Sequence, residues 1–169
     1  MQNPCYTIRK AREEDVVGIG KVHYNGWIDT YSDLLPPAMI ASLSEERSIR
    51  IFQKEGCRNM YVATVNGDMV AFCGYGMWRG AGAEEPPAGE GEIVGIYVLS
   101  QFQRNGIGKA LLEQAERELK QQGCSTVSLW VLEGNTKAQA FYKAMGFQDA
   151  AVKKRSGPLC EAKETKSLE

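Results

Sequence analysis

The first third of the chain has a strand pattern followed by two helical patterns. Residues 6–10 predict a short opening strand. Apolar positions then recur at near-helical spacing from Val16 to Trp27, and acidic residues 13–15 precede them, where a helix N-terminus favours negative charge. Pro36-Pro37 interrupts this pattern, and a second helix is predicted over residues 38–54.

The middle of the chain changes to the two-residue period of strands. Residues 60–65 and 69–73 are strand-like runs joined by Asn66-Gly67. Both positions of such a turn tolerate a positive φ, so a hairpin is predicted here. Residues 79–91 are rich in Gly, Pro and Ala and are predicted to form a flexible loop within the domain. Another strand is predicted over residues 92–99.

Two helices are predicted in the next segment, with a strand between them. The first has one apolar face from Ile107 to Leu119 and ends at Gly123, a natural C-terminal cap. Residues 127–131 alternate as in a strand. Asn135 is suited to cap the second helix, which ends at Gly146.

Residues 147–169 are predicted to form a closing hairpin and tail, with strands over 147–154 and 159–164. The element order β-α-α-β-β-β-α-β-α-β-β predicts an α/β fold, in which a mixed central sheet carries helices on both faces. A chain of 169 residues is long enough to bury its own core, so residues 1–169 are predicted to be one domain.

The charge balance excludes some classes of partner. Lys and Arg number 20 and Asp and Glu 21, so the net charge of −1 gives no broad basic field for nucleic acid or an acidic membrane face. No apolar run approaches the ~18 residues that span a bilayer, and the first residues lack a secretory pattern. We therefore expect neither nucleic acid nor membrane as a partner.

The cysteines and the single histidine limit the chemistry further. Five widely spaced cysteines without a Cys-x-x-Cys pair do not suggest a disulfide framework or a zinc site, and they fit a reducing cytoplasm. His23 is the only histidine, and a helix-surface or core position is favoured for it over a catalytic one. No metal site is predicted.

The turn Gln103–Lys109 stands between a predicted strand and a predicted helix. Gly106 and Gly108 allow a ligand to approach the backbone closely, and the helix start offers unpaired N–H groups, which suits a pyrophosphate. A P-loop requires Ser or Thr after its lysine, and Ala110 stands there. A dinucleotide-binding fingerprint requires a third glycine, and Leu111 stands at that position. The alternative is a glycine turn that only starts a helix.

Two motifs together resemble one enzyme family. Gln103-x-x-Gly106-x-Gly108 is similar to the acyl-CoA-binding signature of the GNAT superfamily of N-acyltransferases. Residues 135–147 resemble the second motif of that family, Asn-x-x-Ala-x-x-Phe-Tyr-x-x-x-Gly-Phe, in the expected order and separation. The resemblance is strong over residues 61–147 and implies a single-domain GNAT-like fold with splayed central strands.

The resemblance also implies which residues bind the donor, acetyl-CoA. The pantetheine arm would pair with the strand edge 96–98, where an N–H group could polarise the thioester carbonyl. Backbone N–H groups from Arg104 through Lys109 would hold the pyrophosphate, and Asn135 would contact the arm from the other side. The implied donor-binding residues are Ile96, Tyr97, Val98, Gln103, Arg104, Asn105, Gly106, Ile107, Gly108, Lys109, Asn135 and Tyr142.

Acetylation of an amine needs two proton transfers. A primary amine has a pKa near ~10 and must lose a proton before it attacks. Glu92 stands where many family members place their base, and the alternative is a solvated carboxylate at a strand end. Tyr142 matches the family tyrosine that protonates the leaving CoA thiolate, and the alternative is a core aromatic on the helix stripe.

The acceptor is the least determined part. Trp27 and Tyr31 lie where the acceptor site of the family usually forms, and Tyr97 either lines that pocket or packs under a helix. We expect an acetyl-CoA-dependent N-acetyltransferase whose amine, a small molecule rather than a protein, attacks directly in a ternary complex. A longer acyl donor, a protein N-terminus or lysine as acceptor, and a non-catalytic CoA-binding sensor are the alternatives. Family members are often dimers, which leaves a homodimer open.

Overall fold

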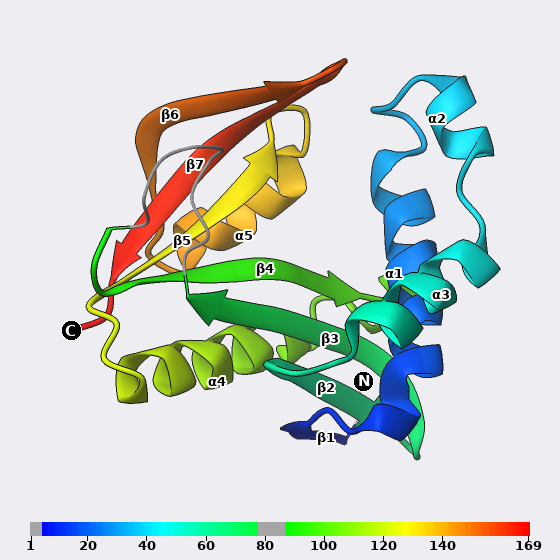
Figure 1. Ribbon diagram of the computed structural model, residues 1–169, viewed down its shortest axis with the longest axis horizontal. Helices are drawn as coiled ribbons and strands as arrows, with labels where there is room; N and C mark the ends of the chain where they lie inside the picture. Colours follow the sequence, from blue (N-terminus) through cyan, green and yellow to red (C-terminus); the bar gives the residue numbers. More distant parts are fainter. Residues whose placement is uncertain (1–4, 78–86) are drawn as a thin grey trace. The chain divides into compact units, whose positions relative to one another are not determined.

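The computed structural model describes residues 5–77 and 87–169 (Figure 1). Two 3-10 turns, Glu13–Asp15 and Ser100–Phe102, accompany its helices and strands. The helices are α1 (Val16–Tyr31), α2 (Pro37–Ala41), α3 (Glu45–Glu55), α4 (Ile107–Gln121) and α5 (Thr136–Ala144). The strands are β1 (Tyr6–Lys10), β2 (Met60–Val65), β3 (Asp68–Met77), β4 (Glu90–Val98), β5 (Thr126–Leu132), β6 (Gln148–Ser156) and β7 (Leu159–Ser167).

The strands form one mixed sheet of seven in the order β1-β2-β3-β4-β5-β7-β6. β1, β2 and β3 are antiparallel neighbours, β4 and β5 are parallel, and β5, β7 and β6 are again antiparallel. The turn between β2 and β3 has φ of 51° at Asn66 and 89° at Gly67, as the Asn-Gly pair predicts. The predicted α/β fold is confirmed.

The parallel ladder between β4 and β5 covers only part of the two strands. It runs from Glu90 opposite Thr126 to Ile93 opposite Leu129, while β4 continues to Val98 and β5 to Leu132. The last residues of both strands therefore carry backbone groups outside this ladder. That the two strands splay beyond this ladder stays a prediction from the family resemblance.

The chain divides into two compact units, and both β3 and β4 contribute residues to each. Unit 1 comprises residues 1–74 and 95–115, and its core is the buried cluster Ile19, Val22, Phe52, Cys57, Val62 and Phe72. This cluster joins α1 and α3 to one face of β2 and β3. On α4, Gln114 Nε2 donates to the hydroxyl of Tyr61, 3.2 Å away. Because Tyr61 and Val62 are adjacent on β2, they point to opposite faces, so unit 1 has helices on both faces of its strands.

Unit 2 comprises residues 75–94 and 116–169. Val127, Leu129 and Val131 of β5 are buried on one face of that strand, and Ser128 is buried on the other. Gly91 of β4 leaves room for Leu119 of α4, since a Cβ at this glycine would come within 2.9 Å of that side chain. β6 and β7 form the predicted closing hairpin, which continues beyond 154 and 164 to Ser156 and Ser167.

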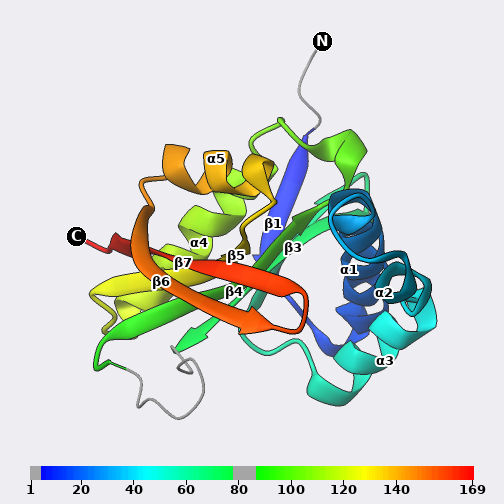
Figure 2. The same ribbon diagram turned by 90° about the horizontal axis from the view of Figure 1, so that it is seen from above.

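Two sequence predictions need correction. The helix predicted over 38–54 is two helices, because Ser44 takes an extended conformation and its side chain accepts from the N–H of Arg47 as the N-cap of α3. A loop is predicted over residues 79–91. Residues 79–86 of it lie outside the described residues, and residues 90 and 91 belong to β4. Figure 2 shows α1, α2 and α3 lying together.

Candidate active site

The turn before α4 has the backbone of an anion site. Arg104 and Gly106 have positive φ, 64° and 81°. Ala110 donates the first helical hydrogen bond, 3.0 Å, to the carbonyl of Gly106. The N–H groups of residues 107–109 therefore have no acceptor within the helix, and they stand at the positive end of its dipole. The sequence prediction for this turn rests on Gly106 and Gly108, and of these two glycines only Gly106 has a positive φ.

The turn is tied to the end of β4 by a side chain. Gln103 Nε2 donates to the carbonyl of Val98 at 3.0 Å, and Asn105 Nδ2 donates to the carbonyls of Phe102 and Gln103, both at 3.2 Å. Gln103 and Asn105 therefore shape the turn with their side chains. The structure brings the predicted strand edge 96–98 and the predicted pyrophosphate turn together within unit 1.

Aromatic rings lie beside this strand edge. Trp27 Nε1 donates to the Tyr97 hydroxyl at 3.0 Å, and the ring of Tyr97 stacks on Phe72 with centroids 5.3 Å apart. The rings of Trp27 and Tyr31 are 4.6 Å apart. Tyr97 thus packs under α1 and also contacts Trp27, so the two predicted acceptor residues and the strand edge form one cluster.

His23 is part of the same cluster and is electrically neutral at neutral pH. Its ring contacts Trp27, Phe52, Phe72 and Tyr97, and burial lowers its pKa to about 4. Its Nδ1 lies 3.1 Å from Ser48 Oγ on α3. The core position favoured from the sequence is therefore observed.

In unit 2, Asn135 and Tyr142 stand on α5. Asn135 caps the helix, with Oδ1 accepting from the N–H of Ala138 at 3.2 Å. Tyr142 is buried at 9% exposure between Phe141 and Phe147, whose ring centroids are 5.3 and 5.8 Å away. The cap uses the oxygen of Asn135, and its Nδ2 has no hydrogen-bond partner among the described residues.

Glu92 is not a solvated carboxylate, because only 6% of it is exposed. Glu92 lies opposite Ser128 in the β4–β5 ladder. The hydroxyl of Ser128 donates to Glu90, which lies two residues before Glu92 on the same face of β4. Glu90, which the sequence placed in the loop, is buried in β4 and pairs with Lys163 Nζ of β7 at 2.7 Å. The sequence did not reveal this buried polar group, because Lys163 is distant along the chain.

Two cavities accompany these residues, one in each unit. A cavity of about 260 Å³ lies between α1, α2 and α3 and is lined by His23, Tyr24, Trp27, Leu35, Met39, Ser42, Leu43, Ser44, Arg47, Ser48 and Ile51. We call it the α1–α3 cavity. Trp27 lines it, and Tyr31 does not. Only Trp27 among these residues was an acceptor prediction.

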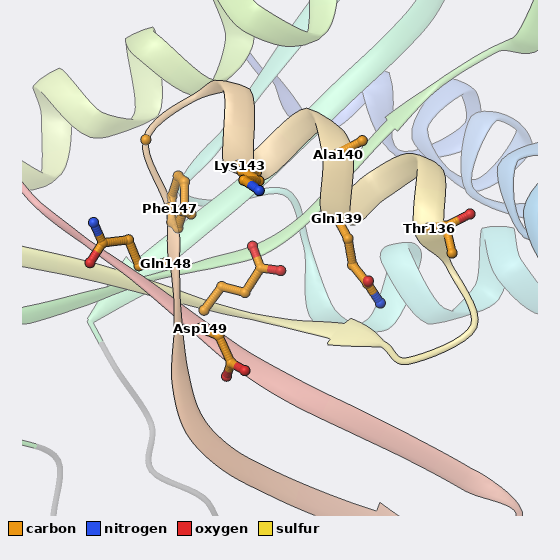
Figure 3. Close-up of a pocket in the computed structure, with 9 residues that line it drawn as sticks. Thr136, Gln139, Ala140, Lys143, Phe147, Gln148 and Asp149 are labelled. Carbon is orange, nitrogen blue, oxygen red and sulfur yellow. The ribbon is translucent and has the colours of Figure 1, made fainter.

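The other cavity, of about 710 Å³, is formed by α5, β6 and β7. Figure 3 shows Thr136, Gln139 and Lys143 of α5 on one side, and Gln148 and Asp149 of β6 on the other. Glu164 of β7 also lines it, and its Oε2 is buried without a hydrogen-bond partner among the described residues. Burial and the nearby Asp149 raise the Glu164 pKa.

No cluster of three or more metal-ligating side chains occurs among residues 5–77 and 87–169. In the same residues no helix is long and apolar enough to span a membrane.

Comparison with known proteins connects these features to one family. The model of the acetyltransferase (GNAT) family matches residues 27–147. An uncharacterised N-acetyltransferase of Bacillus subtilis, YuaI, is 32% identical over 139 residues, which are 82% of this chain and 78% of that protein. The ribosomal protein bS18-alanine N-acetyltransferase of Escherichia coli is 32% identical over 101 residues, 60% of this chain and 62% of the relative.

The fold comparison agrees. The crystal structure of the PaiA N-acetyltransferase of Thermoplasma acidophilum, in complex with coenzyme A, superposes with a TM-score of 0.71 at 21% identity. The match covers 94% of this chain and 98% of that structure. At this identity the match bears on the fold alone.

Proposed function

The chain belongs to the acetyltransferase (GNAT) family and is an N-acetyltransferase, and from this premise we propose that it transfers the acetyl group of acetyl-CoA to the primary amine of a small molecule. The transfer occurs by direct attack in a ternary complex. The observation that carries the proposal is the turn before α4, whose positive φ at Gly106 and free N–H groups suit a pyrophosphate.

The donor occupies backbone groups of unit 1 in this proposal. The pyrophosphate accepts from the N–H groups of the turn 104–109, and Arg104 and Lys109 add positive charge at its rim. The pantetheine arm pairs with the edge 96–98 of β4, where one N–H group polarises the thioester carbonyl. Asn135 donates its amide to the arm.

The reaction forms one bond and breaks one. The neutral amine nitrogen attacks the thioester carbonyl carbon, the C–N bond forms, and the C–S bond then breaks. Glu92 takes the proton that the amine loses, directly or through water, and Tyr142 donates a proton to the leaving thiolate. A base with the low exposure of Glu92 is shielded from bulk solvent, which supports its assignment.

A protein N-terminus is the second candidate acceptor. The E. coli relative bears the name of an enzyme that acts on the alanine of a ribosomal protein. The aligned region covers only 60% of this chain, so this candidate ranks below the small molecule. An acetylated protein N-terminus that appears only with the active enzyme would favour it.

Initial-rate kinetics with acetyl-CoA and a panel of primary amines tests the proposal. Direct attack predicts double-reciprocal lines that intersect. Parallel lines would indicate an acyl-enzyme and would contradict the ternary complex.

The role of Tyr142 has its own test. Tyr142→Phe removes the acid and keeps the ring, so we expect kcat to fall about 100-fold or more while the affinity for acetyl-CoA is unchanged. Tyr61→Phe is the control, because it removes a hydroxyl from another buried tyrosine, on β2. Unchanged turnover in Tyr142→Phe would exclude this assignment.

A further inference from the structure

The α1–α3 cavity has an apolar body with a single charge at its border. The apolar part of its wall is formed by Trp27, Leu35, Met39 and Leu43. At about 260 Å³ it lies just below the range of roughly 300–1,000 Å³ that is usual for ligand pockets. The volume suits a small molecule with an apolar body better than an extended peptide.

The charge at the border is positive. His23 lines the cavity but is neutral at neutral pH, so Arg47 is the only formally charged side chain among the lining residues. Glu45 and Glu46 precede Arg47 on α3 and do not line the cavity. An anionic group therefore fits this border.

The Arg47 guanidinium has capacity for another partner. Its Nη1 donates a long hydrogen bond of 3.4 Å to the carbonyl of Ser42, and no carboxylate pairs with the guanidinium among the described residues. A planar guanidinium binds a carboxylate with two parallel hydrogen bonds.

The cavity also adjoins the proposed reaction centre. Trp27 forms part of its wall and, through Nε1, contacts the hydroxyl of Tyr97 at 3.0 Å. Tyr97 stands between Ile96 and Val98 on the strand edge that would hold the thioester. A molecule against Trp27 is therefore one side chain away from that edge.

We propose, on the basis of the function proposed above, that the α1–α3 cavity binds the acceptor, and that the acceptor is a small amine with an apolar body and a carboxylate that pairs with Arg47. The amine points past Trp27 toward β4. Arg47 is a specificity-determining residue in this account and takes no part in proton transfer.

Matched acids and amides test this directly. L-Phenylalanine, L-methionine and 6-aminohexanoate are compared with their carboxamides in a thiol-release assay and by calorimetry in the presence of CoA. Because amidation also lowers the pKa of an α-amine, the acid-to-amide ratio of kcat/KM is compared between wild type and variants. We expect Arg47→Ala to lower kcat/KM for the acids about 10- to 100-fold, mainly through KM, and to leave the amides unchanged.

Two further variants separate recognition from general charge effects. Arg47→Lys keeps the charge but loses the planar fork, so it should restore part of the lost activity. Arg50→Ala removes an exposed arginine of the same helix that does not line the cavity, and it should leave the ratio unchanged.

Several results would overturn the inference. These are an equal loss for acids and amides in Arg47→Ala, no loss for either, or no binding and no turnover of any of the three acids. If acetyl-CoA binds and amides or other amines are acetylated, the proposed function stands and this inference fails. If acetyl-CoA does not bind, the proposed function itself fails.

Discussion

The glycine turn before α4 and the α1–α3 cavity lie in the same unit, yet they are built from different groups. The turn offers backbone N–H groups, and its geometry depends on positive φ at two positions of the loop, Arg104 and Gly106. The cavity is lined by α1, α2 and α3 and by the segments that join them, and it includes an uncharged histidine and one arginine. A site made of backbone needs particular residues at fixed spacing, whereas a site made of side chains depends on how separate helices pack.

The largest effect that we predict concerns the cavity. His23 keeps a pKa of about 4 in the folded protein, below the ordinary 6.5, so only the unfolded chain takes up its proton between these values. The stability that neutral His23 confers is therefore complete above pH 6.5 and is lost as the pH falls toward 4, by about 2–3 kcal/mol.

The variant His23→Gln removes this dependence, and chemical denaturation at a series of pH values measures it. Because His23 is the only histidine, the difference between the two proteins isolates it. The same pH slope in both would show that the cavity does not hold the ring neutral. Acetyl-CoA affinity should stay unchanged, since the turn uses backbone groups.

The next effect concerns the turn. Gly106→Ala places a side chain at φ of 81°, although its Cβ would meet only the Tyr6 hydroxyl at 3.7 Å. The strain of about 1–2 kcal/mol shifts the turn, so acetyl-CoA should bind about tenfold more weakly.

Gly123→Ala is the matched control for the turn, because Gly123 follows the other end of α4 at φ of 91° with nothing within 4 Å of its Cβ. It should cost similar stability and leave acetyl-CoA binding intact. Equal affinity losses in the two variants would mean that strain alone weakens binding, and the contrast between turn and cavity would then be lost.

The smallest effect concerns the larger cavity between α5, β6 and β7, which belongs neither to the glycine turn nor to the α1–α3 cavity. Glu164 lies directly opposite Asp149 in the β6–β7 ladder, and like charges in this position destabilise a sheet. Glu164→Gln should raise the free energy of unfolding at pH 7 by about 0.2–1 kcal/mol. Because the folded-state pKa is raised, this gain should vanish as the pH falls and Glu164 becomes protonated.

Thermal unfolding at pH 7 and pH 4 measures this gain, and kcat/KM should not change. A change in kcat/KM would bring the larger cavity into the active site. Cavity volume would then be a better guide to the site than the turn.

The same contrast explains what could be predicted from the sequence. Asn66-Gly67 and the turn at Gly106 were found because backbone at positive φ selects particular residues. The break between α2 and α3 was missed because the cap is one serine, Ser44, inside an otherwise helical pattern. The buried pair Glu90–Lys163 and the meeting of His23 with Ser48 join residues distant in sequence, and no local pattern marks them.

The central claim, that the turn before α4 binds the acyl donor, is tested most directly by titrating acetyl-CoA into the purified protein by calorimetry, with CoA for comparison. We predict saturable binding with a dissociation constant in the range of about 1 µM to 1 mM that is usual for enzyme substrates. At a hundred times that constant, acetyl-CoA should stabilise the protein by about 2.7 kcal/mol. No binding of acetyl-CoA, CoA or a longer acyl-CoA would contradict the claim, and the turn would be only the start of a helix.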